Sequence, residues 1–221
     1  ATTPDGGAYL LATINYSGDT GDIALIKIDS LSNWQWHQVY NLNPTSFFSR
    51  DVAAGVSITQ DGGVMFSCRR TFPNDNTYAY IYKLDQNHNE VWLNNENFLE
   101  GPAYKIQELL DNTIIVAGTS FATSTSNIVR GEIVKLDLNG ITLWRRGYGG
   151  NKNGYFYDMI VYNQDYSGKS GCVLCGRKES DLPPGRADAW LVRLNCMGLL
   201  TEPQATFTIA PLPSQPQTMA F

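Results

Sequence analysis

The chain has 221 residues, of which 43% are hydrophobic, 12% aromatic and only 17% charged. This balance is typical of aromatic-rich β-sheet and excludes a disordered chain or a coiled coil. The net charge of −5 argues against nucleic-acid binding, which needs basic patches. No apolar run approaches the roughly 18 residues of a membrane span. We therefore expect a globular all-β protein with no membrane span and no nucleic-acid partner.

A basic–apolar–acidic motif recurs four times along the chain. Its copies are Lys27-Ile28-Asp29, Lys83-Leu84-Asp85, Lys135-Leu136-Asp137 and Arg193-Leu194-Asn195. A tryptophan follows seven residues after the acid in the first three copies (Trp36, Trp92 and Trp144), and Glu202 takes its place in the fourth. The steps from copy to copy are 56, 52 and 58 residues. A period of this size in a β-rich chain predicts a β-propeller or a similar array.

Each repeat divides into the same predicted strands. One strand follows a turn such as Asp61-Gly62-Gly63, because Asp-Gly pairs supply the positive φ of tight hairpins. These strands cover residues 8–13, 64–69, 113–119 and 172–177. A second strand ends on the repeated motif, over residues 23–28, 78–84, 132–136 and 189–194. A third strand carries the tryptophan, and a strand that leads into the next repeat covers residues 52–59, 103–110 and 157–162.

Four antiparallel strands per repeat make one propeller blade, so residues 1–209 are predicted to form four blades. The first repeat lacks its leading strand. The β-prone segment 205–209 would supply this strand and close the ring; alternatively, the chain is part of a larger ring. Residues 210–221 contain Pro211, Pro213 and Pro216 and are expected to be a linker or tail.

Strand alternation collects the long loops of such an array on one face, and binding residues tend to lie on loops held by a rigid scaffold. Aromatic rings beside polar groups suit sugar or protein surfaces, because a flat ring buries area at low entropic cost. Several of these rings would alternatively fold inward and seal the gaps between blades. The candidate ligand-binding residues on this face are Tyr16, Asp19, Phe47, Phe72, Phe121, Tyr155, Phe156 and Arg177.

Nothing in the sequence predicts catalysis, a metal site or a cofactor. The repeated Asp, Lys and Trp residues favour structural roles, since a catalytic site is normally unique. No serine lies in a Gly-x-Ser-x-Gly elbow. Cys172 and Cys175 have CxxC spacing, but positions three apart on a strand point to opposite faces. Cys172 and Cys196 begin and end paired strands and are a candidate disulfide, whereas Cys68 and Cys175 are expected to be free and buried.

The repeat resembles the secreted β-propeller repeats of large surface proteins in Bacteroidetes-type bacteria. The resemblance is carried by Asp61-Gly62-Gly63, by Leu25-Ile26-Lys27-Ile28-Asp29, by Asp137…Gly140…Trp144 and by Tyr148-Gly149-Gly150, and it covers about residues 3–202. It implies a secreted or cell-surface location and neighbouring domains in a larger chain. The segment from Glu202 to Thr208 is similar to the entry into an immunoglobulin-like module, which competes with ring closure by this segment.

These observations together predict a non-catalytic scaffold or adhesion module that binds a glycan or an extracellular protein through one loop face. A carbohydrate-binding lectin is the sharper form of this hypothesis. A glycoside hydrolase or another extracellular hydrolase is the alternative from a different class, because the separation of two catalytic carboxylates is spatial and cannot be read from spacing.

Overall fold

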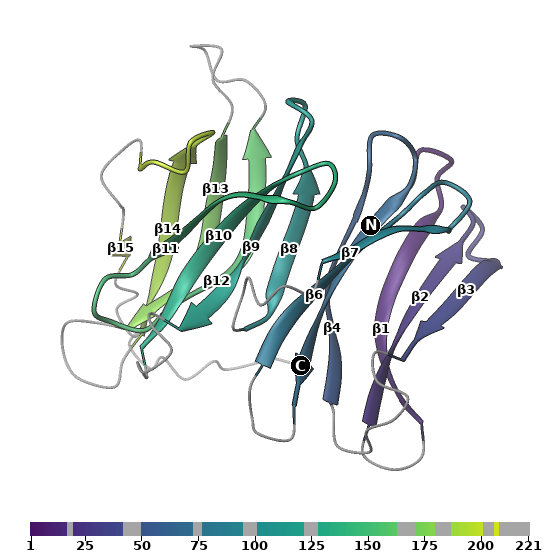
Figure 1. The fold of residues 1–221 in the computed structure, drawn as a ribbon, viewed down its shortest axis with the longest axis horizontal. Helices are drawn as coiled ribbons and strands as arrows, with labels where there is room; N and C mark the ends of the chain where they lie inside the picture. The colour runs from purple at the N-terminus through teal and green to yellow at the C-terminus, as the bar shows by residue number, and fades with distance from the viewer. Residues whose placement is uncertain are drawn as a thin grey trace, which may run out of the picture.

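The protein is built entirely of antiparallel sheets over the residues described by the computed structural model, which are 1–16, 20–41, 50–72, 77–94, 101–121, 128–162, 171–179, 187–200 and 206–207. Four sheets, which we name A to D, stand side by side in chain order (Figure 1). Sheet A contains β1 (Ala8–Tyr16), β2 (Thr20–Ile28) and β3 (Trp34–Tyr40). The all-β prediction is therefore confirmed.

Sheets B, C and D each have four strands that follow one another in sequence order. Sheet B contains β4 (Arg50–Ile58), β5 (Val64–Thr71), β6 (Thr77–Leu84) and β7 (Glu90–Asn94). Sheet C contains β8 (Ala103–Glu108), β9 (Thr113–Phe121), β10 (Val129–Asp137) and β11 (Thr142–Tyr148). Sheet D contains β12 (Gly154–Tyr162), β13 (Gly171–Glu179), β14 (Ala187–Asn195) and β15 (Thr206–Phe207). We call β4, β8 and β12 the leading strands.

The turn after each repeated motif has one construction in all four sheets. In sheet B, Oδ1 of Asp85 accepts hydrogen bonds from the N–H groups of Asn87 and Asn89, both at 2.8 Å. Asp29, Asp137 and Asn195 bind the equivalent N–H groups in the same way. The side-chain oxygen thus satisfies backbone donors that the turn leaves unpaired, which explains why the motif ends in Asp or Asn.

Alternation along the strands gives every internal sheet two apolar faces. In sheet B, Val64 and Phe66 pack toward sheet A, while Met65 and Ile81 pack toward sheet C. Buried side chains form three clusters: one between A and B, one between B and C, and one between C and D. A strand enclosed on both faces needs consecutive apolar residues, which the motif strand β6 shows from Tyr78 to Tyr82.

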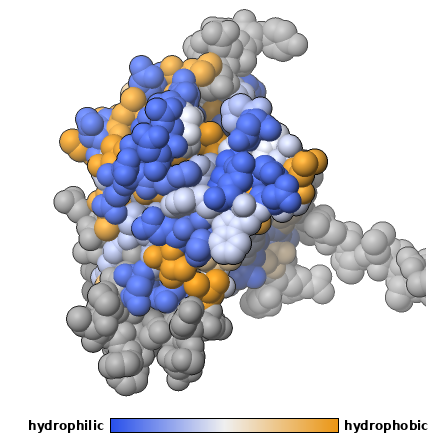
Figure 2. Space-filling model, turned by 90° about the vertical axis from the view of Figure 1, so that its right-hand side faces the viewer, coloured by the Kyte–Doolittle hydropathy of each residue, from blue (hydrophilic) through white to orange (hydrophobic). Residues whose placement is uncertain are grey.

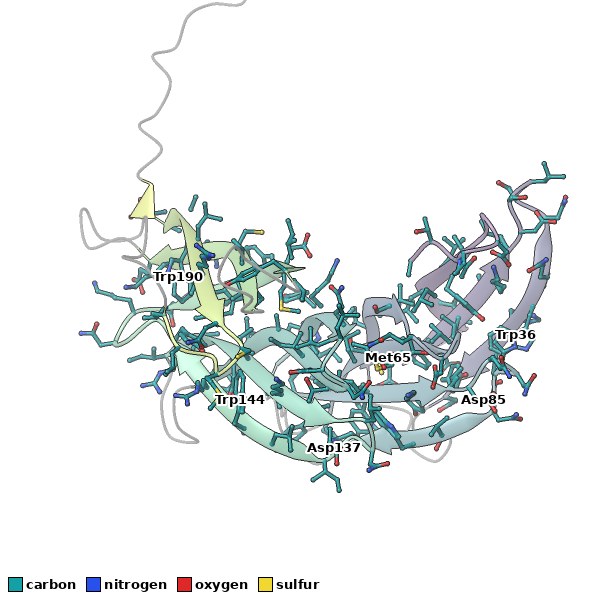
Figure 3. The ribbon with its side chains drawn as sticks, turned by 90° about the horizontal axis from the view of Figure 1, so that it is seen from above. Trp36, Met65, Asp85, Asp137, Trp144 and Trp190 are labelled. Atoms are coloured by element: carbon teal, nitrogen blue, oxygen red, sulfur yellow. The ribbon has the colours of Figure 1, made fainter. Side chains whose placement is uncertain are left out.

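The four sheets follow an open arc and not a closed ring (Figure 3). Contacts between successive sheets are made chiefly by the leading strands: β4 contacts β1 and β2, β8 contacts β4 and β5, and β12 contacts β8, β9 and β10. Trp144 and Asp137 lie toward the convex side, whereas Met65 lies nearer the concave side (Figure 3). Four sheets with three intervening cores leave sheet A and sheet D at the two ends.

Two predictions about the end of the chain need correction. The segment expected to complete the first repeat instead adds β15 to the outer edge of sheet D, where Thr206 pairs with Trp190 and Phe207 with Ala189. Cys172 and Cys196 are both free thiols, so the candidate disulfide does not form. Cys172 lies opposite Leu194, whereas Cys196 stands beyond the end of β14 in the following turn. The predicted tail, 210–221, lies outside the described residues.

Candidate functional site

The repeated Lys and Asp residues form a structural unit at the short-turn end of the sheets. Lys83 reaches across to Asp61, with Nζ 3.2 Å from Oδ2. Lys27 and Asp5 make the same pair at 3.1 Å, and Lys135 and Asp111 at 2.9 Å. A threonine hydroxyl also donates to each of these carboxylates. Since the arrangement recurs in three sheets, we assign it to turn formation and not to a unique chemical site.

The three repeated tryptophans occupy equivalent positions and join neighbouring sheets, in keeping with the structural role that their repetition favours. The indole Nε1–H of Trp92 donates to the carbonyl oxygen of Leu138 at 2.8 Å, and its ring lies over Gly140 in the turn of sheet C. Trp144 lies in the same way over Gly198 in the turn of sheet D. Trp36 stacks on His88 in the turn of sheet B, with ring centroids 4.0 Å apart. Each outer strand is thus held to the next sheet.

Two shallow hollows at the short-turn end of the sheets lie beside these tryptophan contacts. One, of about 440 Å³, is lined by Trp36, Lys27 and His88 among others, and the other, of about 410 Å³, by Trp92 and the turn of sheet C. The hydroxyl of Tyr9 lies 2.6 Å from Nε2 of His88. Burial lowers the pKa of His88, although Asp85 acts in the opposite direction. A neutral imidazole in a tryptophan–turn contact fits a packing role.

A non-repeated cluster of rings lies on the concave side, near the long-loop end. It arises from β-bulges at one register of the three leading strands, between Ala53 and Gly55, Ala103 and Lys105, and Phe156 and Asp158. The extra residue at each bulge is Ala54, Tyr104 or Tyr157. A bulge re-aims its side chain and is over-represented beside active sites. Only sheets C and D therefore place an aromatic ring here.

The rings from these two sheets touch one another. The centroids of Tyr104 and Tyr157 are 5.8 Å apart in an edge-to-face arrangement. Tyr155 stacks nearly parallel to Tyr157 at 6.3 Å, with an interplanar angle of 18°. Tyr157 is 45% exposed, whereas Tyr104 and Tyr155 are half-buried. The three rings together form a partly exposed aromatic platform, in which Tyr155 and Tyr157 are nearly parallel and Tyr104 stands edge-on.

Two arginines supply positive charge to this platform. The guanidinium of Arg177 lies over the ring of Tyr155, with Cζ 4.6 Å from the centroid, in cation–π geometry. Arg69 and Arg177 both act on Tyr104: burial raises the pKa of its hydroxyl, and their charges oppose that shift. Nε of Arg69 is buried and hydrogen-bonds to no described residue. We name Arg69, Tyr104, Tyr155, Tyr157 and Arg177 the Tyr–Arg cluster.

An ion pair borders the Tyr–Arg cluster. Lys105 Nζ lies 3.2 Å from Asp158 Oδ1, and this pair bridges the leading strands of sheets C and D. Both residues directly follow a bulge residue, so the pair links the two leading strands next to Tyr104 and Tyr157. The cluster is thereby built on four strands, β5, β8, β12 and β13, and not on a single loop.

The predicted ligand-binding residues fall into different environments. Tyr155 and Arg177 are in direct contact within the Tyr–Arg cluster. The prediction for Phe156 is wrong, because this ring is fully buried between sheets C and D and stacks on Trp190 at 4.7 Å. Strand alternation explains the difference, since it turns adjacent residues of β12 to opposite faces. Phe156 thus follows the alternative for this group, in which a ring folds inward and seals the gap between two sheets.

Of the remaining predicted residues, Phe72 and Phe121 have other surroundings than the cluster. Phe72 follows β5 and packs against Arg70 and Tyr78. Phe121 ends β9 and is 44% exposed. Tyr16 ends β1, and Asp19 and Phe47 lie outside the described residues.

Sequence reasoning did not single out Tyr104 or Arg69. When the repeats are aligned on the aspartates of their turns, Tyr104 takes the place of Ala54, because each lies seven residues before its aspartate, Asp111 or Asp61. A tyrosine at a position where another repeat has alanine is the signal that could have found Tyr104.

Comparison with known proteins adds no family to this picture. No model of a protein family matches the chain, and no curated protein is significantly similar to it. The described residues contain no group of three or more His, Cys, Asp or Glu side chains that could hold a metal ion. They also contain no helix long and apolar enough to cross a membrane. The site therefore has to be interpreted from its own geometry.

Proposed function

We propose that the chain is a non-catalytic binding module, built as four blades of a β-propeller, that recognises an acidic glycan through the Tyr–Arg cluster. The propeller interpretation is supported by the four-stranded sheets, which meet along their leading strands on the concave side of an arc. We further propose that it works as a lectin-like adhesion or scaffold domain of a secreted or cell-surface protein. The repeat resemblance motivates that location.

One observation carries the choice of ligand: Arg177 lies over the ring of Tyr155, which in turn stacks on Tyr157. Tyrosine rings present flat apolar faces that match the C–H faces of a pyranose, while the phenol hydroxyls offer hydrogen bonds. A guanidinium binds a carboxylate or sulfate with two parallel hydrogen bonds. A sugar that carries an acid group satisfies both parts of the cluster, and a neutral sugar satisfies only the first.

The test is binding to immobilised acidic and neutral oligosaccharides, followed by calorimetry on the strongest ligand. We expect Tyr155→Ala and Tyr157→Ala each to weaken binding by at least about 2 kcal/mol, the size expected of an anchor ring. Arg177→Ala should remove the preference for acidic over neutral sugars. Trp34→Ala is the matched control, because Trp34 is 65% exposed but lies at the start of β3, outside the cluster.

Three other results would point elsewhere. If the control and the cluster variants lose binding equally, the ligand does not bind at the cluster. If no oligosaccharide binds but an extracellular protein does, and the cluster variants abolish that binding, the module recognises a protein surface. Turnover of a chromogenic glycoside by the purified chain would contradict a non-catalytic role and favour a hydrolase.

A further inference from the structure

Charge is distributed unevenly across the Tyr–Arg cluster, in rows that the strand registers define. Arg69 on β5 and Arg177 on β13 occupy equivalent positions, because each pairs with the residue two places before the bulge residue of its leading strand. Sheet C carries Tyr104 between these two sheets; burial raises the pKa of the Tyr104 hydroxyl, and the charges of both arginines oppose that shift. Positive charge is therefore gathered on the long-loop side of the tyrosines.

The row on the short-turn side carries two opposite charges that are paired with each other. The residue directly after the bulge residue is Lys105 in sheet C and Asp158 in sheet D, and Lys105 Nζ lies 3.2 Å from Asp158 Oδ1. Arg193 is two strands and two residues away from Asp158, about 12 Å at ordinary sheet spacings, which exceeds the Debye length of about 8 Å at physiological salt. The cluster thus has a positive side and a compensated side.

The bulge in β12 brings both sides within reach of one short oligosaccharide. Tyr155 pairs with Arg177 and Asp158 pairs with Cys175, so the two residues of β12 share one face of sheet D and lie two register steps apart, about 7 Å. Tyr157 is the extra residue between them. An oligosaccharide that stacks one pyranose on Tyr155 and runs along β12 therefore has its next sugar at Tyr157, beside Asp158.

The carboxylate of Asp158 decides which sugar fits at this second place. Its side chain is 56% exposed and that of Lys105 is 38% exposed, so a ligand meets the carboxylate before the ammonium group. Oδ1 of Asp158 contacts Lys105 and also accepts the N–H of Met159 at 2.8 Å. Oδ2 makes neither of these contacts and keeps its capacity to accept hydrogen bonds from hydroxyl or amide groups of a sugar. An acid group at this place would instead meet a like charge.

We propose that the ligand of the Tyr–Arg cluster alternates acidic and neutral sugars, with an acidic sugar at Tyr155 and Arg177 and a neutral sugar at Tyr157 and Asp158. This inference rests on the proposed function, because it names the kind of acidic glycan that the same site selects. A chain with an acid group on every sugar is disfavoured, since its second acid group meets Asp158. A neutral chain is disfavoured, since it offers no anion to the Arg177 guanidinium.

The test compares three tetrasaccharides by calorimetry at physiological ionic strength. Hyaluronan tetrasaccharide alternates glucuronic acid with N-acetylglucosamine, tetragalacturonate has an acid group on every sugar, and chitotetraose is neutral. We expect the hyaluronan tetrasaccharide to bind at least about fivefold more tightly than tetragalacturonate, the size expected of one like-charge contact at about 4 Å in water.

Asp158→Asn separates the effect of charge from the other differences between these sugars. It removes the like charge and releases Lys105, so it should raise the affinity for tetragalacturonate at least about fivefold and change that for the hyaluronan tetrasaccharide by less than about twofold. Lys105→Met leaves Asp158 uncompensated and should weaken tetragalacturonate binding further. Glu90→Gln is the matched control, because it removes one exposed negative charge at the start of β7, outside the cluster, and should alter neither affinity.

The same variants distinguish the cluster from adsorption elsewhere. Figure 2 shows the end of the molecule formed by sheet A, where apolar residues lie in several separate groups among polar ones. A sugar bound there would respond neither to Asp158→Asn nor to Arg177→Ala.

Two results would overturn the alternation, and they differ in what else they affect. Equal binding of the two acidic tetrasaccharides, unchanged in Asp158→Asn but weakened in Arg177→Ala, would remove the alternation and leave the acidic-glycan site standing. If neither acidic tetrasaccharide binds more tightly than chitotetraose, the proposed function fails and the alternation fails with it.

Discussion

Replacement of Trp92 by alanine tests whether the repeated tryptophans hold neighbouring sheets together. The ring packs against the core between sheets B and C and over Gly140, and its Nε1–H donates to Leu138 at 2.8 Å. Trp92 is half-buried, so about 100 Å² of apolar surface would be lost, worth about 2.5 kcal/mol at 25 cal/mol per Å². The lost hydrogen bond adds about 1 kcal/mol. We expect Trp92→Ala to lower the free energy of unfolding by about 3.5 kcal/mol.

Urea unfolding followed by far-ultraviolet circular dichroism measures this loss. Trp92→Phe keeps most of the ring contact but no N–H group, so it should cost about 1 kcal/mol. Trp34→Ala is the control, because Trp34 is 65% exposed and makes no contact with a neighbouring turn in the described structure; it should cost less than about 0.5 kcal/mol. Equal small losses for Trp92→Ala and Trp34→Ala would refute the joining role.

Three further outcomes follow from the contacts. Hydrogen bonds from the Thr3 hydroxyl, the Gly7 N–H and Lys27 lower the pKa of Asp5 from 3.8 to about 2, so its stabilisation is complete above pH 3.8 and disappears as the pH falls toward 2; acid titration of Asp5→Asn should show a flatter dependence there. Cys175 is free but exposed, which corrects the expectation that it is buried, so it should react with a thiol reagent in the native protein; Cys172, whose pKa burial raises to about 12, should react only after unfolding, as mass spectrometry would show. Gly176→Ala should lower unfolding stability by about 2 kcal/mol, since its Cβ would lie 1.8 Å from the carbonyl oxygen of Tyr155; an unchanged denaturation midpoint would contradict that bulge geometry.

Local features of the fold were predictable from the sequence because they depend on chemistry that recurs in every repeat. The Asp-Gly turns, the apolar strands and the equivalence of Trp36, Trp92 and Trp144 are all present in the structure. Each depends on contacts within one repeat or with the next one. The open arc was harder to predict from the sequence, because closure of the sheets into a ring depends on where a single strand pairs. The short segment that forms β15 is β-prone, and no local pattern in its sequence tells whether it pairs with β1 or with β14. In the structure it pairs with β14.

The candidate site was only partly predictable. Tyr155 and Arg177 were found because loop-proximal aromatic and basic residues are typical of binding faces. Phe156 was included for the same reason and is buried, because composition does not reveal which residue of an adjacent pair faces the core. Tyr104 and Tyr157 meet only because bulges occur at the same register in β8 and β12. A bulge shifts alternation by one residue, so a strict period of two misplaces every side chain beyond it.

The most direct test of the proposed binding site is nuclear magnetic resonance titration of the isotopically labelled chain with a hyaluronan tetrasaccharide, which carries both carboxylates and pyranose faces. We predict that the largest amide shifts fall at Tyr104, Tyr155, Tyr157 and Arg177, with none at the Trp36–His88 contact, and that Arg177→Ala reduces them to those given by a neutral oligosaccharide. Shifts confined to the short-turn end, or unchanged in Arg177→Ala, would contradict the assignment of the Tyr–Arg cluster as the ligand site.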